Sequence, residues 1–531
     1  GYYLEPRFSA DGTKVIYRTT TGDYALGFTY GVNPGIYWMP ASGGEGTLVR
    51  ETGYDARFAR FAHSGDRVYF LEDIADEKTA MKSVRLDGGD ERTLLTSKYG
   101  TRFVPSPDEN WLAFIELFQA YVMPFPEAGR TFDLSAKSKA MPVTRVSRDV
   151  GAYPHWSGDS RTLHWTVGGE YFSRDLSESF AFVEGAPDSI APPDTTGVPV
   201  GLVITTDVPS GQLALTGARI ITMNGDEVID DGTIVVERNR ITAVGPSAEV
   251  SVPDGATTID CAGKTIMPGM VDVHAHIWHS STGISPQESW LYLANLAFGV
   301  TTTHDPSNPT EMVFTHSEMV KAGLLVGPRV YSTGTILYGA EGDFKAVINS
   351  YDDALSHLRR MKAVGAFSVK SYNQPRREQR QQVIRAAREL EMMVVPEGGS
   401  FFYHNLTMVL DGHTGVEHTI PVAPIYKDVV SLWGASDVGL TPTLNVGYGG
   451  IWGENYWYQH DDVWKHERLM TFTPRPIVDA RARRRMMIPE GDFNHIALSG
   501  NCKELIDAGA SVQLGSHGQR QGLGSHWELW S

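Results

Sequence analysis

Short stretches of alternating apolar and polar residues recur along the first third of the chain. Four of them share one plan: an aromatic or apolar residue precedes a polar turn of Ser, Asp and Gly, and a strand ending in an aromatic follows. Alternation with period two predicts half-buried β-strands, and the polar clusters predict the turns between them. The four segments are PRFSADGTKVIY from Pro6, ARFAHSGDRVYF from Ala59, FVPSPDENWLAF from Phe103 and PHWSGDSRTLHW from Pro154.

The spacing of these segments predicts a repeated β architecture. Their aligned positions Phe8, Phe61, Pro105 and Trp156 are 53, 44 and 51 residues apart, and repeats of about 40 to 50 residues made of short strands are typical of β-propeller blades. The segments resemble the blades of TolB-type propellers, in which a Ser-Pro-Asp-Gly turn recurs. The resemblance implies a partial propeller over residues 1–183, with further blades expected before Gly1, and it favours the periplasm or secretion.

The pattern changes after this region. Residues 184–211 are rich in proline and small polar residues, which predicts a linker. Residues 212–266 carry hairpin patterns around Asn224-Gly225, which predict a small sheet. From residue 267 to 531, eight candidate strands alternate mostly with amphipathic helix patterns, as a parallel barrel requires. We expect these strands to end near His276, Asp305, Thr333, Ser371, Glu397, His418, Leu444 and His517.

The most specific motif is the decapeptide MPGMVDVHAH, residues 267–276. Because strand side chains alternate, its His-x-His places His274 and His276 on one side of a strand end, where two imidazoles can bind one metal ion. The motif resembles the first-strand signature of the amidohydrolase superfamily, metal-dependent hydrolases built on a (β/α)₈ TIM barrel. The resemblance implies that residues 212–266 are the N-terminal part of a composite β-sandwich. It also implies that residues 267–531 are the barrel, truncated after strand eight.

The same resemblance implies further metal ligands at later strand ends. Lys370, at the end of the AFSVKS strand, matches the superfamily lysine that becomes a carbamate and bridges two metals. His418 closes TGVEH and matches the histidine of the family's Glu-His pair, in which the Glu supports the strand. The plainer alternatives are a surface lysine at a strand end and a core histidine without a ligand role.

Two positions depart from the family pattern. Glu397 stands on the fifth strand where a ligand histidine is expected, and a carboxylate is an acceptable zinc ligand. His404 and His413 are alternative replacements. His517 stands on the eighth strand in place of the family's aspartate, which binds metal and acts as general base. Histidine can take either role, so His517 is both a candidate ligand and the candidate catalytic residue, without both roles being assumed at once.

The resemblance implies hydrolysis of a non-ester carbon-nitrogen bond of the amide or peptide type, in a small molecule or a peptide. One or two divalent ions, most simply zinc, would activate water and polarise the carbonyl, and a carboxylated Lys370 favours the two-metal form. Two alternatives stay open. One is a mononuclear deaminase or cyclic-amide hydrolase, and the other is a non-catalytic propeller binding protein whose metal site has decayed.

A long insertion between the seventh and eighth strands is rich in aromatic residues near its start. A connection after a barrel strand lies at the active-site face, so these side chains either line the substrate pocket or pack against another domain. The candidates for substrate contact are Tyr448, Trp452, Tyr456 and Trp457.

Composition narrows the classes of partner. A length of 531 residues suggests two to four domains, and the net charge of -17 argues against a nucleic-acid partner, which needs a basic surface. Two distant cysteines, Cys261 and Cys502, exclude a disulfide scaffold and a thiolate zinc site. The sequence has no apolar run of about 20 residues and no signal peptide, although the start at Gly1 leaves room for one upstream. A homo-oligomer stays open.

Overall fold

A computed structural model describes residues 3–19, 34–52, 56–125, 129–279, 285–372 and 374–531. The chain forms two compact units. The first contains Gly1–Gly201, Leu337–Gly365 and Tyr372–Glu391, and the second contains Leu202–Ile336, Ala366–Ser371 and Met392–Ser531. Within the described residues, no helix has the length and apolar character that crossing a membrane requires.

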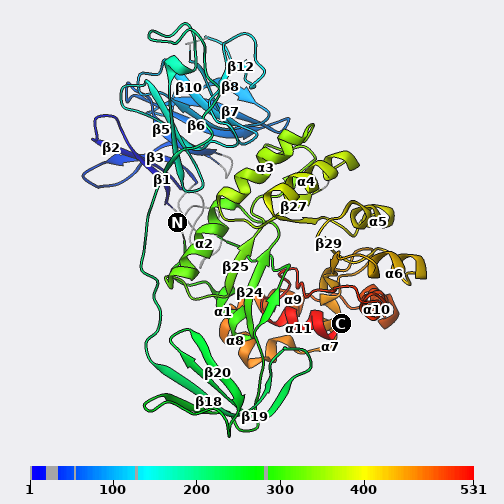
Figure 1. Ribbon diagram of the computed structural model, residues 1–531. Coiled ribbons are helices and arrows are strands. Elements are labelled where there is room, and N and C mark those ends of the chain that lie inside the picture. The colour runs from blue at the N-terminus through cyan, green and yellow to red at the C-terminus, as the bar shows by residue number, and fades with distance from the viewer. Residues whose placement is uncertain (1–2, 20–33, 53–55, 126–128, 280–284, 373) are drawn as a thin grey trace. The chain divides into compact units, whose positions relative to one another are not determined.

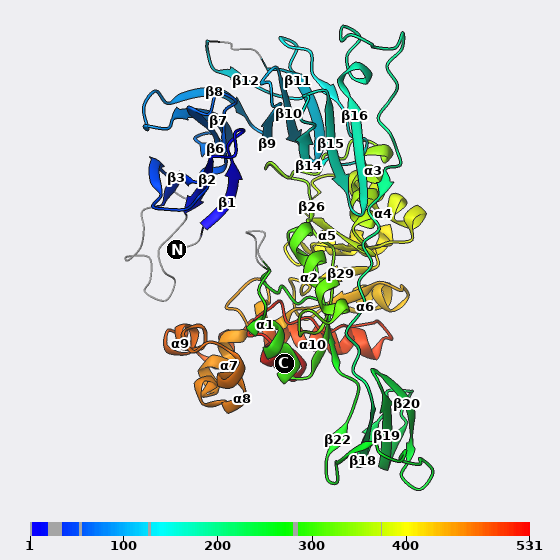
Figure 2. The same cartoon turned by 90° about the vertical axis from the view of Figure 1, so that its left-hand side faces the viewer.

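The N-terminal part of the first unit is an all-β region of four small sheets that follow one another in chain order (Figure 1, Figure 2). Each sheet is a meander of consecutive antiparallel strands, and a short strand completes three of them. The bounds are β1 (Tyr3–Phe8), β2 (Lys14–Thr19), β3 (Gly35–Pro40) and β4 (Thr47–Glu51); β5 (Ala56–Phe61), β6 (Arg67–Ile74), β7 (Lys78–Arg85) and β8 (Arg92–Ser97), with β12 (Phe132–Asp133); β9 (Gly100–Pro105), β10 (Trp111–Glu116) and β11 (Gln119–Pro124), with β13 (Thr144–Arg145); and β14 (Ala152–Trp156), β15 (Thr162–Val167) and β16 (Glu170–Asp175), with β17 (Val198–Pro199).

The polar turn of the repeat explains why each sheet begins with a hairpin. In the first sheet the Ser9 hydroxyl donates to Asp11 at 2.5 Å and accepts from the Lys14 backbone amide at 3.0 Å. Asp and Ser side chains that bond nearby backbone mimic a turn. Ser106 with Asp108 and Ser157 with Asp159 repeat the arrangement, at 2.6 and 2.5 Å. The predicted strands and turns of this region are therefore confirmed.

Two helices from much later in the chain belong to the first unit. They are α3 (Tyr351–Ala363) and α4 (Arg377–Leu390), and both lie in the region for which the sequence predicted amphipathic helices. Ser350 caps α3 in a capping box with Asp353. The Arg360 guanidinium lies 3.8 Å from the centre of the Phe118 ring, and the His357 ring meets the same phenyl edge-on. These contacts pack α3 against the end of β10.

The second unit starts with one sheet. β18 (Gln212–Ile221), β19 (Val228–Glu237) and β20 (Arg240–Pro246) form an antiparallel meander, and β21 (Thr257–Asp260) and β22 (Thr265–Ile266) pair with β18 in parallel. Its buried face is small and includes Ala218, Ile220, Ile234 and Cys261. The hairpins predicted for residues 212–266 are confirmed.

Seven short parallel strands follow in the second unit. β23 (Met270–Asp272), β24 (Val300–Asp305) and β25 (Arg329–Ser332) form one sheet, β27 (Ser368–Tyr372) pairs with β28 (Met393–Pro396), and β29 (Gly415–Glu417) pairs with β30 (Gly439–Thr441). β26 (Leu337–Tyr338) precedes β27. Single bridges from Glu397 to Glu417 and from Leu440 to Val512 extend this order.

The prediction of an eighth strand that ends near His517 was wrong about the length of the strand. Near Val512 the chain makes one bridge to β30, and the amide of Val273 bonds the Leu514 carbonyl at 2.9 Å. Gly515 follows directly, and His517 takes a positive φ of 58°, which a continuing strand does not allow. Leu444, expected at the end of the seventh strand, lies instead in a short 3₁₀ helix after β30.

The remaining helices of the second unit connect these strands and fill the long insertion. Trp433, Leu440 and Leu505 belong to one of its buried apolar clusters. The bounds are α1 (Trp290–Ala297), α2 (Thr310–Ala322), α5 (Phe402–Asp411), α6 (Lys427–Gly434), α7 (Glu454–His460), α8 (Glu467–Phe472), α9 (Arg475–Arg483), α10 (Asn494–Asp507) and α11 (Leu523–Trp530).

Candidate metal centre

Three histidines meet at the carboxyl ends of the parallel strands. His274 and His276 follow β23, and His517 follows the bridge at Val512. The Nε2 atoms of His274 and His276 are 3.0 Å apart, and one nitrogen from each of the three rings falls within 4.8 Å of the others. The structure thus brings together both motif histidines and the histidine expected from the last strand.

Buried Asp272 ties the two segments of this group together. Its Oδ1 accepts from the backbone amides of His274 and Ser516, both at 3.1 Å, and its Oδ2 accepts from the Ser525 hydroxyl at 3.0 Å. Ser516 is the residue before His517, so one carboxylate fixes the backbone of both ligand-bearing segments. The sequence reasoning assigned no role to this aspartate, although it is part of the decapeptide.

The backbone at the histidines is in an uncommon conformation. His276, His418 and His517 have φ values of 36°, 72° and 58°, and Thr443 has 49°. Positive φ costs free energy for residues with a Cβ, and such residues persist where the surrounding structure over-determines them, often at functional sites.

Carboxylates orient two of the three imidazoles. Glu417 Oε2 forms a short contact with His274 Nδ1, and Asp305 Oδ1 lies 3.4 Å from His276 Nδ1. Each carboxylate accepts the Nδ1 proton, which leaves the Nε2 lone pair directed at the other ring. Glu417, which the sequence resemblance assigned to supporting its own strand, therefore contacts a histidine that follows another strand.

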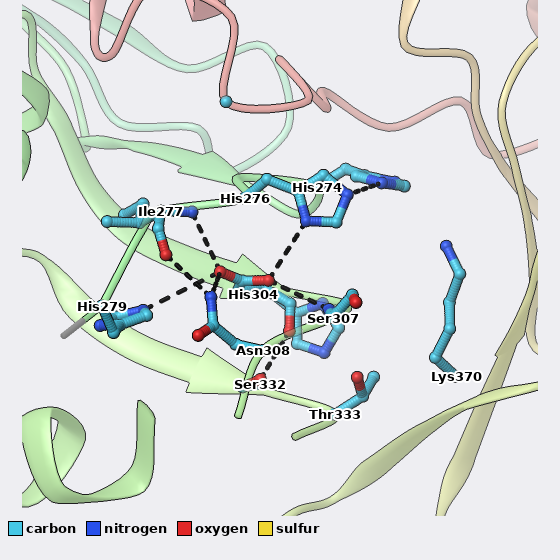
Figure 3. A network of polar contacts seen from close by, with 12 residues as sticks. His274, His276, Ile277, His279, His304, Ser307, Asn308, Ser332, Thr333 and Lys370 are labelled. Atoms are coloured by element: carbon cyan, nitrogen blue, oxygen red, sulfur yellow. Dashed lines mark hydrogen bonds and ion pairs between the residues drawn. The ribbon is translucent and has the colours of Figure 1, made fainter. Parts of the chain in front are cut away.

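Asp305 is held rigidly in turn. Figure 3 shows the surrounding network, in which the amides of Ile277 and Ser307 and the side chain of Asn308 donate to its carboxylate at 3.0, 3.0 and 2.8 Å. Burial alone would raise the pKa of Asp305, but the neighbouring His276 and these donors outweigh burial and lower it. The carboxylate stays ionised and polarises His276.

Burial keeps His274 and His517 neutral. It lowers the pKa of His274 well below its ordinary value, with the charge of Lys370 acting in the same direction. Burial and the charge of His276 lower the pKa of His517 to about 2. Neutral imidazoles are the form that binds metal ions.

A second cluster surrounds Glu397, the residue that replaces the expected histidine. Lys370 Nζ lies 2.8 Å from its Oε2, His418 Nε2 lies 3.1 Å from its Oε1, and the Tyr448 hydroxyl donates to Oε1 at 3.1 Å. Burial alone would raise the pKa of Glu397, but Lys370 and His418 outweigh it and hold that pKa well below its ordinary value. His418 also contacts Thr443 Oγ1 through Nδ1 at 2.8 Å.

The two clusters are adjacent. The His418 ring centre lies 4.9 Å from that of His274 and 5.3 Å from that of His517. Lys370 is 2% exposed, so the interpretation of it as a surface lysine is wrong. The alternative ligands lie on another element: His404 is on α5, and His413 Nδ1 contacts the Met408 carbonyl at the end of that helix.

The four aromatic residues predicted to contact the substrate lie at different places in the structure. Tyr448 lies at the centre, bonded to Glu397 and edge-on to the His418 ring. Tyr456 and Trp457 are on α7, where Tyr456 packs against Phe493 and Trp457 stacks on Trp527. Trp452 is 46% exposed. The structure therefore brings one of the four to the histidines.

No protein-family profile matches the chain. Among curated proteins, imidazolonepropionase from Rhizobium rhizogenes is 50% identical over 54 residues, which are 10% of this chain and 13% of that protein. Adenine deaminase 2 from Bradyrhizobium sp. (strain ORS 278) is 38% identical over 76 residues, 13% of each protein. Both matches are short segments of the two proteins. The matches span 13 to 16% of the first curated relatives' length.

Solved structures of amidohydrolases also match, at low similarity. A Xaa-Pro dipeptidase with bound methionine in the active site has a TM-score of 0.44 and 16% identity, covering 60% of this chain and 84% of that one.

Proposed function

We propose that the second unit is a metal-dependent hydrolase that cleaves a non-ester carbon-nitrogen bond of the amide or peptide type. The observation that supports this most strongly is the convergence of three imidazoles, two of them backed by carboxylates. Two Nε2 lone pairs facing each other at 3.0 Å repel, and a cation bound to both removes the repulsion. The separation suits two ligands of one ion at the roughly 2.0–2.1 Å typical of zinc-nitrogen bonds.

His274, His276 and His517 would hold the first divalent ion, most simply zinc. Lys370, Glu397 and His418 are the proposed ligands of a second, with Lys370 carboxylated in that form. When bound, such ions lower the pKa of water toward neutrality and polarise a carbonyl. Of the two roles proposed for His517, ligand and proton acceptor, its pKa of about 2 favours the ligand role.

Other side chains would position the substrate. The Tyr448 hydroxyl donates to Glu397 and can donate instead to a substrate oxygen beside it. Trp452, Tyr456 and Trp457, which lie further along the same insertion, are proposed as additional substrate contacts. A small molecule or a peptide is the proposed substrate.

We also propose the finer architecture. The four sheets are interpreted as TolB-like propeller blades over residues 1–183, followed by a linker over 184–211 and the sandwich part over 212–266. The seven parallel strands and the bridge at Val512 are interpreted as a (β/α)₈ barrel over 267–531. The chain order of the meanders and the order of strand pairs support this proposal.

Two other functions compete. A mononuclear deaminase or cyclic-amide hydrolase is favoured by the single three-histidine group and by the ion pair that occupies Lys370. Adenine deaminase 2 among the relatives points the same way. A binding protein with a decayed site is opposed by the carboxylate behind each of two ligands, because a decayed site has no use for them.

The test is metal content per chain by plasma mass spectrometry, followed by assays on dipeptides, cyclic ureides and purines. Two equivalents with dipeptide hydrolysis support the proposal. One equivalent with activity on cyclic substrates supports the mononuclear alternative. The double variant His274→Ala/His276→Ala should lose metal and activity, while exposed His460→Ala should keep both. Absence of metal after reconstitution would refute the hydrolase.

A further inference from the structure

One position of the N-terminal repeat lines a common cavity in the first unit. The residue directly before each aligned position contributes to a cavity of about 180 Å³. Each of these residues comes from the first strand of its sheet, and they are Arg7, Arg60, Val104 and His155. The repeat therefore gathers one side chain per sheet around a shared space.

A shift in strand register lies next to three of these four residues. The strand register shifts between Leu4 and Arg7 in β1, between Arg57 and Arg60 in β5, and between Ala152 and His155 in β14. A β-bulge bends its strand and re-aims the side chain beside it. The same device at the same place in three sheets argues that the cavity is a built-in feature of the repeat.

The charges in this cavity lack compensation. Within the described part of the chain, the guanidinium groups of Arg7 and Arg60 have no ion pair and no hydrogen bond. Burial and the charge of Arg7 lower the pKa of Arg60 to about 10, and the charge of Glu109 offsets this only in part. The Glu109 carboxylate is engaged by the His63 backbone amide at 2.7 Å. Arg60 therefore stays protonated at neutral pH, and the charge of Arg7 opposes it across the cavity.

The rest of the lining is mostly apolar. Phe58, Phe103, Pro154 and Trp156 contribute, and the one polar atom of the Trp156 side chain, Nε1, donates to the Val104 carbonyl at 2.8 Å. A third guanidinium, that of Arg102, lies 3.8 Å from the centre of the Phe58 ring. Arginine forks match the geometry of a carboxylate, whereas apolar walls would leave the remaining oxygens of inorganic phosphate without donors.

We propose that this cavity binds a small carboxylate with an apolar body, whose carboxylate is held by Arg7 and Arg60 and whose body packs on the aromatic and proline wall. The site lies wholly in the first unit and does not depend on the proposed hydrolase.

The test is isothermal titration of the full chain with benzoate, with benzamide as the uncharged isostere and with inorganic phosphate. The proposal expects saturable binding of benzoate and at least about tenfold weaker binding of the other two, since charge-assisted bonds contribute about 1.5–3 kcal/mol. Equal binding of benzamide would show an apolar pocket, and preferred binding of phosphate would show an inorganic anion site; either result overturns the proposal.

Substitutions of Arg60 test whether benzoate binds at this cavity. Arg60→Gln should weaken benzoate binding at least about tenfold, and Arg60→Lys, which keeps the charge without the fork, should weaken it less. Arg57→Gln is the matched control, because Arg57 lies on the same strand and is ion-paired with Asp73 at 2.6 Å; its affinity should stay within about twofold. Unchanged binding in Arg60→Gln overturns the proposal.

Two further measurements distinguish ligand binding at this cavity from a structural role of Arg60 and from binding in the second unit. Without ligand, Arg60→Gln should unfold at the same temperature as the wild type or a higher one, because a repulsion is removed; a lower midpoint would indicate a structural role and count against the proposal. Benzoate could also meet a metal ion in the second unit. Binding should therefore persist in His274→Ala/His276→Ala, and its loss there would move the site to the histidines.

Discussion

The histidine centre of the second unit and the arginine cavity of the first are both assembled from strand ends far apart in sequence, yet they differ in what stands behind their polar groups. In the centre, Glu417 and Asp305 contact the outer nitrogens of His274 and His276. In the cavity, no described carboxylate pairs with Arg7 or Arg60. Carboxylates behind neutral imidazoles direct lone pairs inward and prepare a site for a cation, whereas uncompensated guanidinium groups direct donors inward and prepare a site for an anion.

The largest expected effect comes from removing the residue that joins the two ligand segments of the centre. Asp272→Ala leaves the buried amides of His274 and Ser516 without an acceptor. Each unsatisfied buried donor costs about 1–3 kcal/mol, so urea unfolding should show a loss of at least about 2 kcal/mol together with weaker metal binding. Asp254→Ala, at an exposed position, serves as control. An unchanged unfolding midpoint would show that Asp272 does not join the segments.

Removing one compensating charge should make the centre more like the cavity. Burial raises the pKa of Glu417 to about 7, so the comparison is made above that pH, where the group is ionised. In Glu417→Gln the amide oxygen can still accept from His274 Nδ1, but the negative charge is gone. Partners behind metal-binding histidines are typically worth about 10- to 100-fold in affinity, and a competition titration with a chelator measures the change. Glu318→Gln on the exposed face of α2 should bind metal as the wild type does. Equal metal affinity in Glu417→Gln and Glu318→Gln would show that the charge behind His274 does not prepare the centre for a cation.

Acid should destabilise the metal-free centre. His517 has a pKa of about 2 in the folded chain against an ordinary value of 6.5, so between these pH values the unfolded chain binds a proton that the folded chain does not. The unfolding free energy therefore falls as the pH drops below 6.5, by up to about 1.4 kcal/mol per pH unit for each such histidine. Thermal midpoints between pH 5 and 8 test this. His517→Gln should flatten the profile, and a profile as steep as that of the wild type would contradict the assignment.

The smallest effect concerns the aromatics of the insertion. Tyr448→Phe removes one hydrogen bond to Glu397, worth about 0.5–1.5 kcal/mol, and should change substrate affinity while metal content stays the same. Tyr426→Phe, at a 73% exposed position outside the proposed site, should change neither. If both variants have the same substrate affinity in steady-state kinetics, Tyr448 does not contact the substrate.

Local pattern predicted much of this molecule, and long-range contacts account for what it missed. The strands and Ser-Asp turns of the repeat, the two amphipathic helices and the His274–His276 pair follow from residues within one turn or strand of each other. The contact between Glu417 and His274 joins residues 143 positions apart, and no spacing rule connects them. The one signal in the sequence for Asp272 and Asp305 was a carboxylate at the end of a buried strand.

The aromatic residues of the insertion and the eighth strand show a second limit of prediction from the sequence. Tyr448 and Trp457 look alike in sequence, but only Tyr448 reaches Glu397, because Trp457 packs on Trp527 of α11. Packing on a distant helix leaves no local signature. The eighth strand was predicted to reach His517 from the apolar residues before it, but His517 itself takes a positive φ, which ends the extended conformation.

The division of the chain into units has a consequence for how the protein is made. The first unit takes α3 and α4 from segments that end at Glu391, about 190 residues after its N-terminal part ends at Gly201. At a synthesis rate of about 5–20 residues per second, the ribosome needs roughly 10 to 40 seconds to supply them. For that interval the emerging β region lacks the contacts that Arg360 and His357 of α3 make with Phe118, so these contacts can form only after translation has passed α3.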